Sequence, residues 1–156
     1  MKILTAFYSR SGRTKKIGEL IASELQSDVE EFSDTVKRSG LIGWLRCGYQ
    51  AMKKITTELN PIEKNPSEYD LVLIGTPIWG GTISVPTRTY IIKYADKFKS
   101  VAFFCTAGGD EFQGLFAEME SVCGKKPVAV VGISRKEFKN DMYFEKLKEF
   151  IAKIQK

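Results

Sequence analysis

The chain has 156 residues, of which 43% are hydrophobic, and a formal net charge of +5 at pH 7. That length suits one globular domain with a full core, and no run of about 18 apolar residues predicts a membrane-spanning helix. Histidine is absent, which excludes the commonest general base and metal ligand. We therefore assign no catalytic residue and no metal site, and expect any chemistry to come from a bound cofactor.

The three cysteines, Cys47, Cys105 and Cys123, form no Cys-x-x-Cys pair. The sequence therefore predicts neither a disulfide framework nor a zinc site, and the apolar surroundings of Cys105 and Cys123 predict small core residues. A strand-like run follows Met1 directly, without a charged and then apolar leader. We therefore expect a cytoplasmic protein.

A predicted strand from Ile3 to Tyr8 leads through Ser9-Arg10-Ser11-Gly12-Arg13-Thr14 into a helical pattern from Lys15 to Leu25. The start of a helix offers unpaired N–H groups and the positive end of the helix dipole, and hydroxyl side chains add donors. The pattern indicates a phosphate-binding loop, although an ordinary capped turn uses the same residue types.

A weaker strand, Val29 to Phe32, precedes a basic segment at about residues 36–57, which we interpret as an insertion in a single domain of residues 1–156. The segment has no acidic residue, and its five basic residues equal the net charge of the whole chain. It covers a ligand, docks a partner, or forms an apolar helix that packs on the body. The residues that would pack in the last case are Leu41, Leu45, Tyr49 and Met52.

A strand from Leu71 to Gly75 is followed by Thr76-Pro77-Ile78-Trp79-Gly80-Gly81-Thr82 and a helical pattern from Thr87 to Phe98. Glycines beside Trp79 leave room for a planar ligand, so this turn predicts an exposed aromatic rim. The alternative is a tryptophan that caps the core beneath a mobile loop.

The last two predicted strands are Val101 to Thr106 and Val128 to Ile133, followed by helices from Glu111 to Cys123 and from Glu137 to Ile154. Regular alternation of strand and helix favours a parallel sheet covered on both faces. Ligands of such sheets bind at the carboxyl ends of the strands. A phosphate loop and an aromatic turn at that edge suit flavin mononucleotide (FMN).

These motifs, in this order and over nearly the whole chain, resemble those of flavodoxins. The resemblance implies an α/β three-layer sandwich with a five-stranded parallel sheet in the order 2-1-3-4-5, and one FMN at its carboxyl edge. FAD is expected to bind less well if the pocket stops at the monophosphate. Matched by position, the cofactor-binding residues are Ser9, Arg10, Ser11, Gly12, Arg13 and Thr14 for the phosphate, and Pro77, Ile78, Trp79, Gly80, Gly81, Thr106, Ala107, Gly108 and Gly109 for the ring.

The resemblance implies a low-potential electron-transfer protein that acts between redox partners. An FMN-dependent oxidoreductase that reduces a small substrate such as a quinone is the alternative, and a basic binding module without redox role is a further one. Three features depart from common flavodoxins: Phe112 is the nearest aromatic to the second ring loop, the chain is basic, and the basic segment is an insertion that a minimal flavodoxin lacks. We therefore expect a redox partner with an acidic docking face, and no binding to nucleic acid, because aromatic residues are few and no nucleic-acid module is present.

Overall fold

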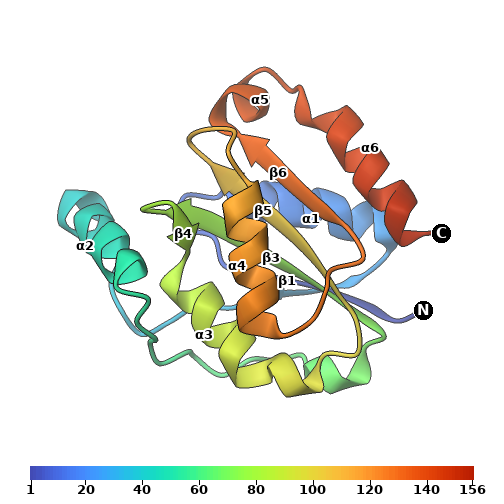
Figure 1. Ribbon diagram of the computed structural model, residues 1–156, viewed down its shortest axis with the longest axis horizontal. Helices are drawn as coiled ribbons and strands as arrows, with labels where there is room; N and C mark the ends of the chain where they lie inside the picture. Colours follow the sequence, from blue (N-terminus) through green and yellow to red (C-terminus); the bar gives the residue numbers. More distant parts are fainter.

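Strands and helices alternate along the computed structural model, which describes all residues from 1 to 156 (Figure 1). The strands are β1 (Ile3–Phe7), β2 (Asp28–Glu31), β3 (Leu71–Trp79), β4 (Thr82–Ile83), β5 (Val101–Ala107) and β6 (Val130–Ser134). The helices are α1 (Arg13–Leu25), α2 (Gly40–Met52), α3 (Val85–Tyr94), α4 (Gln113–Cys123), α5 (Arg135–Lys139) and α6 (Tyr143–Ile154), with 3-10 turns η1 (Pro66–Glu68) and η2 (Ala95–Lys97). None of the helices combines the length and apolar character that crossing a bilayer requires.

Five of the strands form a parallel sheet in the order β2-β1-β3-β5-β6. Numbered among themselves along the chain, these five strands have the order 2-1-3-4-5, so the predicted topology is confirmed. Helices α1 and α6 contact each other on one face of the sheet, while α3 and α4 contact each other on the opposite face (Figure 1). The two faces make the three-layer sandwich that the resemblance implied.

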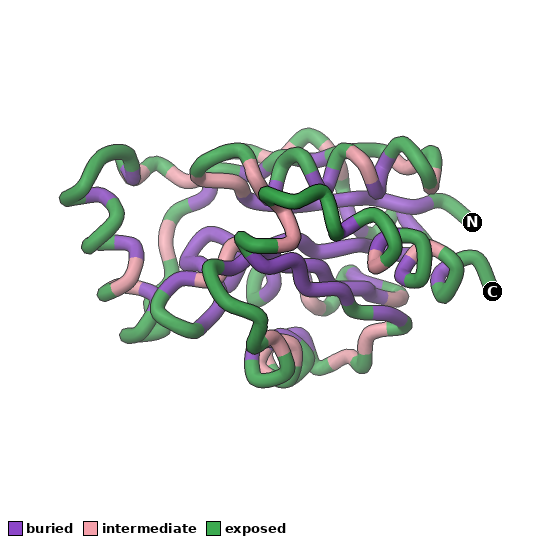
Figure 2. Tube along the Cα trace, turned by 90° about the horizontal axis from the view of Figure 1, so that it is seen from above, coloured by how far each residue is buried: buried purple, intermediate pink, exposed green.

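Two apolar cores, one on each face, follow the alternation of side chains along the strands. In β1, Leu4 and Ala6 belong to one core, while Ile3 and Phe7 belong to the other. The sheet is therefore buried on both sides, as the strand interior in Figure 2 shows. Cys105 and Cys123 lie in one of these cores, as predicted, and burial raises the pKa of both thiols.

The segment after Gly75 is a β-hairpin and not the open turn that the sequence predicted. Strand β3 continues to Trp79, and β4 pairs with it antiparallel, with Trp79 opposite Thr82. Gly80 and Gly81, the two turn residues, have φ angles of +57° and +78°. Tight hairpins need such angles, and glycine adopts them without steric cost.

The predicted helix from Glu137 to Ile154 is two helices, α5 and α6, separated at Asp141, whose φ is +53°. Helix α5 begins with a capping box. The Ser134 hydroxyl accepts a hydrogen bond from the N–H of Glu137, and the Glu137 carboxylate accepts one from the N–H of Ser134. Such reciprocal bonds fix the direction in which a helix leaves a strand.

Helix α2 packs on the body through small residues, so of the three alternatives for this segment the one in which its large apolar residues pack on the body is wrong. Gly43, Cys47 and Ala51 are buried. Spaced four residues apart, they form one stripe along the helix. A Cβ on Gly43 would lie 2.5 Å from the carbonyl carbon of Arg38, so only glycine fits there. The large apolar side chains of α2 are each more than half exposed: Leu41, Ile42, Trp44, Leu45, Tyr49 and Met52.

Candidate functional site

The loop between β1 and α1 lies at the carboxyl edge of the sheet, beside the point where the strand order reverses. Ligands of doubly wound sheets bind at this point. The Ser9 hydroxyl accepts hydrogen bonds from the N–H groups of Gly12, at 3.1 Å, and Lys15, at 3.2 Å. Gly12 has a φ of +91°, which lets the chain turn sharply into α1. The loop is thus held in a fixed shape by its own side chain.

The first turn of α1 has backbone donors without acceptors. No hydrogen bond in the structure uses the N–H groups of Arg13 or Thr14. These groups point along the helix axis, where the helix dipole adds partial positive charge. A Cβ placed on Gly12 would meet no atom within 4 Å, so the space above the loop is open. Free donors, positive potential and open space together fit a phosphate group.

The Thr14 side chain joins the phosphate loop to the second predicted ring loop. Thr14 is only 2% exposed, and its hydroxyl shares a 2.8 Å hydrogen bond with that of Thr106, at the end of β5. The loop hydroxyls were expected to act as outward donors to an anion. Thr14 departs from this expectation, because its hydroxyl is engaged in the interior while its N–H remains free.

Trp79 is buried at 8% exposure, so the expectation of an exposed aromatic rim is wrong. Its ring meets that of Tyr8 edge to face, with centroids 5.4 Å apart, and the Arg38 guanidinium lies 5.3 Å from its centroid. The physical reason is the extension of β3, which places Trp79 against α2 and within one of the cores. The predicted alternative, a tryptophan that caps the core, describes this position.

The β4 strand of the hairpin is tied to helices α3 and α4. Arg88 forms a salt bridge with Glu118, and both side chains hydrogen bond to the Thr82 hydroxyl. Burial alone would raise the pKa of Glu118, but the hydrogen bonds from Thr82 and Arg88 outweigh it and lower that pKa. No sequence motif indicated this triad. The one available signal was Arg88, one of only two charged residues in α3, the other being Lys93.

The second predicted ring loop offers space but no aromatic side chain. Thr106 and Ala107 are buried, while Gly108 and Gly109 are exposed, and a Cβ on either glycine would meet no atom within 4 Å. Phe112 packs against Gly132, where an added Cβ would come within 2.3 Å of its ring. Phe112 therefore belongs to the packing of β6 and does not stand over the open glycines.

The segment before α2 is anchored by a buried ion pair, Asp34–Arg38, whose side chains are 2% and 3% exposed and 2.6 Å apart. Burial alone would lower the pKa of Arg38, but the Asp34 carboxylate raises it above its usual value. Arg10 of the phosphate loop donates hydrogen bonds to the carbonyl oxygens of Arg38, at 3.0 Å, and Gly40, at 3.2 Å. Helix α2 is therefore linked to the phosphate loop.

These contacts reduce the free positive charge of the basic segment. Arg38 is paired with Asp34, and Lys54 lies 3.5 Å from Glu118. Lys37, Arg46 and Lys53 have no carboxylate partner and remain exposed. In the sequence all five cations are equivalent, because a charge total does not reveal which side chains are paired.

Three cavities surround the loop and α2. An apolar one of about 420 Å³ lies between α2 and the hairpin and is lined by Ile78, Trp79 and Gly80, among others. A polar one of about 450 Å³ lies between Ser9 and the Asp34–Arg38 pair. A third, of about 510 Å³, lies beyond the phosphate loop, between α2 and α5. Predicted site residues line all three cavities.

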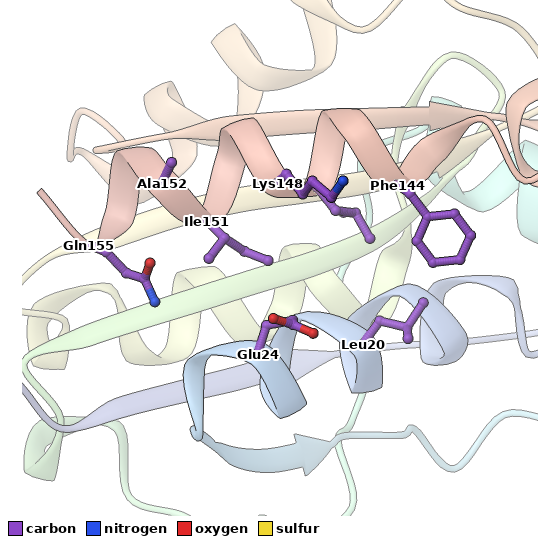
Figure 3. A pocket seen from close by; sticks show the side chains of 8 residues that line it. Leu20, Glu24, Phe144, Lys148, Ile151, Ala152 and Gln155 are labelled. Atoms are coloured by element: carbon purple, nitrogen blue, oxygen red, sulfur yellow. The ribbon is translucent and has the colours of Figure 1, made fainter.

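A further groove of about 240 Å³ lies between α1 and α6 (Figure 3). Its walls are mainly apolar, with Leu20 and Glu24 on α1 facing Phe144, Lys148 and Ile151 on α6. None of the predicted site residues lines this groove. It is therefore separate from the site at the carboxyl edge.

A doubly wound parallel sheet with an open phosphate loop at its switch point defines a class of α/β proteins that bind phosphorylated ligands at this edge. A model of the flavodoxin family matches residues 2–153, and the chain belongs to that family. An uncharacterized protein of Archaeoglobus fulgidus is 24% identical over 150 residues, which make up 94% of each chain.

Solved structures share the fold. A flavoprotein from Lactobacillus acidophilus NCFM, crystallised with FMN, is 25% identical with a TM-score of 0.73, over 89% of this chain and 97% of its own. A flavoprotein from Bacteroides eggerthii, 21% identical, also has a TM-score of 0.73, over 90% of this chain and 95% of its own. Oxidised flavodoxin 1 from Bacillus cereus is 16% identical with a TM-score of 0.53, over 98% and 96%.

Proposed function

We propose that the protein binds one FMN at the carboxyl edge and transfers electrons at low potential between redox partners. The observation that carries the proposal is the pair of free N–H groups at Arg13 and Thr14, in the open loop at the switch point. The similar Lactobacillus flavoprotein, crystallised with FMN, supports the identity of the phosphorylated ligand.

In this proposal the loop from Ser9 to Thr14 holds the phosphate. The ring lies between the hairpin residues 77–81 and the second loop, residues 106–109, where the two open glycines leave space. Bound FMN supplies the electron-transfer chemistry, since it accepts and gives electrons one or two at a time. The chain's own residues bind and orient the cofactor, and without histidine it offers no ordinary proton donor near neutral pH.

FMN is expected to bind the apoprotein with one-to-one stoichiometry, and riboflavin roughly a hundredfold more weakly, because hydrogen bonds to a charged group contribute about 1.5–3 kcal/mol each. Fluorescence quenching of each flavin during titration measures both affinities. Flavin absorbance of the purified protein is a second readout. Equal affinity for the two flavins, or no quenching by either, would contradict the phosphate loop.

We propose that the partner presents an acidic face to the exposed side of α2. That side has an apolar centre, formed by the large side chains of the helix, and free positive charge at Arg46 and at Lys53, whose ammonium lies over the Tyr49 ring. Transient docking surfaces combine an apolar centre with a polar rim, and charge complementarity directs the encounter. The charge therefore selects an acidic partner over a basic one.

Reversing Arg46 and Lys53 to glutamate is expected to slow oxidation of the reduced protein by ferricyanide about tenfold at low salt, because attraction to the anion is lost. Oxidation by the cation hexaamminecobalt(III) should become faster.

The control reverses Lys97 and Lys126, which are exposed at the opposite edge of the sheet, and gives the same net charge. Stopped-flow rates measure each case. Equal effects from both variants would show that only net charge matters, and lost FMN affinity would place α2 in the cofactor site.

The apolar cavity between α2 and the hairpin favours a second candidate, FMN-dependent reduction of a small apolar substrate such as a quinone. Its volume of about 420 Å³ is within the range of small-molecule sites. As a carrier, the purified FMN-loaded protein is expected to oxidise NADH or NADPH with a quinone no faster than free FMN does. Steady-state turnover well above that background would establish the second candidate.

A further inference from the structure

The phosphate loop opens into a second, strongly basic cleft. The cleft has a volume of about 510 Å³ and lies between the loop, helix α2 and helix α5. Sequence patterns gave no sign of it, because its cations come from three separate segments. Its lining residues are Arg10, Ser11, Arg13, Trp44, Arg135, Phe138 and Lys139.

The positive charge of the cleft has no counter-charge. No ion pair and no side-chain hydrogen bond in the structure involves the side chain of Arg13, Arg135 or Lys139. The acidic residue of α5, Glu137, is engaged elsewhere, since it accepts from the N–H of Ser134 and pairs with Lys146 at 2.5 Å. Burial, and then the nearby Arg135, lower the pKa of Arg13. A bound anion would relieve this repulsion.

The shape and charge of the cleft exceed what one phosphate needs. The flavin phosphate already has the free N–H groups of the loop. The additional cations therefore suit a further phosphate. Trp44, which is 58% exposed, adds an aromatic wall on which a flat base can lie, whereas the Phe138 ring is already stacked on Tyr143 and contacted by Lys16. Phosphate and planar aromatic ring together describe a nucleotide.

We propose that this cleft binds an adenine nucleotide, with its phosphate on Arg13, Arg135 and Lys139 and its base against Trp44. The inference rests on the proposed function in placing the flavin phosphate at the neighbouring loop. Two sources have this chemistry: the adenylate half of FAD, joined to the flavin phosphate, and a free nucleotide such as ADP beside FMN. If the cleft binds the adenylate half of FAD, the pocket extends beyond the monophosphate, and FAD is then not expected to bind less well than FMN.

The test compares affinities in the wild-type protein, in the double variant Arg135→Ala/Lys139→Ala, and in the control Lys136→Ala. Lys136 is an exposed cation of the same helix that does not line the cleft. Apoprotein is titrated with FMN and FAD, and FMN-loaded protein with ADP, by calorimetry at low and high salt. We expect the double variant to lower the affinity for FAD or ADP roughly tenfold at low salt, and that for FMN by less than about twofold.

The outcomes separate the two sources and the two proposals. Selective loss of FAD affinity assigns the cleft to the adenylate half of FAD, and selective loss of ADP affinity assigns it to a free nucleotide. An equal loss for FMN and FAD, or no ADP binding together with unchanged FAD affinity, overturns the inference. If wild-type apoprotein binds no FMN, the proposed function fails. If ADP nevertheless binds to that apoprotein, and the double variant weakens this binding, the nucleotide site in the cleft is still supported.

Discussion

Replacing Trp79 by alanine is expected to lower the free energy of unfolding by about 3–5 kcal/mol, the usual cost of truncating a large buried aromatic side chain. The side chain is 8% exposed, meets Tyr8 edge to face and lies under the Arg38 guanidinium. Its removal leaves a cavity at the place where the hairpin and α2 meet. Helix α2 should therefore loosen together with the global loss of stability.

Urea unfolding followed by circular dichroism measures this loss. The matched control is Trp44→Ala, because Trp44 has the same side chain at 58% exposure, and its effect should stay within about 0.5 kcal/mol. Trp79→Phe should fall between the two. If Trp79→Ala instead keeps its stability and loses FMN affinity by about 1 kcal/mol, the tryptophan acts as a ring contact and not as a core residue.

Replacing Arg38 by methionine is expected to cost about 3–5 kcal/mol of folding free energy, because it leaves the buried Asp34 carboxylate without its partner. Both side chains are almost fully buried, and Arg38 also donates to Gln50 at 2.9 Å. The loss should appear first in the segment before α2. Hydrogen exchange of that segment, alongside urea unfolding of the whole protein, measures both effects.

The control is Lys15→Met, which breaks the Lys15–Glu31 pair. That pair has a similar separation of 2.6 Å, but both side chains are more than a third exposed. Exposed pairs contribute about 0–1 kcal/mol, so the control should barely change stability. Comparable losses from the two variants would mean that burial of the Asp34–Arg38 pair has no energetic consequence.

The sheet and the loop from Ser9 to Thr14 could be predicted because their signals are local. Continuous apolar runs indicate strands that are buried on both faces, and regular alternation with helices leaves few topologies. The loop from Ser9 to Thr14 was recognisable for the same reason, since a hydroxyl-rich turn directly before a helix predicts an anion-binding site from neighbouring residues alone. The structure adds to this loop the two N–H groups that remain free.

The arrangement of α2 and the hairpin could not be predicted from the sequence. Large apolar residues at helical spacing ordinarily mark the buried face, but Gly43, Cys47 and Ala51 occupy that face here. Small residues are required on this face because the segment before α2 passes so close to the helix that a Cβ on Gly43 would overlap the backbone of Arg38. Trp79 and the Asp34–Arg38 pair depend on the same tertiary contact, which no local pattern reveals.

The small-residue stripe of α2 separates the helix into a side that maintains the fold and a side that does not. Substitutions at Leu41, Leu45 or Tyr49 remove few packing contacts, because these side chains are exposed. Such substitutions therefore lower the free energy of unfolding only slightly. Because proteins are only marginally stable, substitutions of this kind are the ones that accumulate in evolution. The outer side of α2 can thus diversify while the rest of the chain stays the same, so one scaffold can acquire new partners through a single helix.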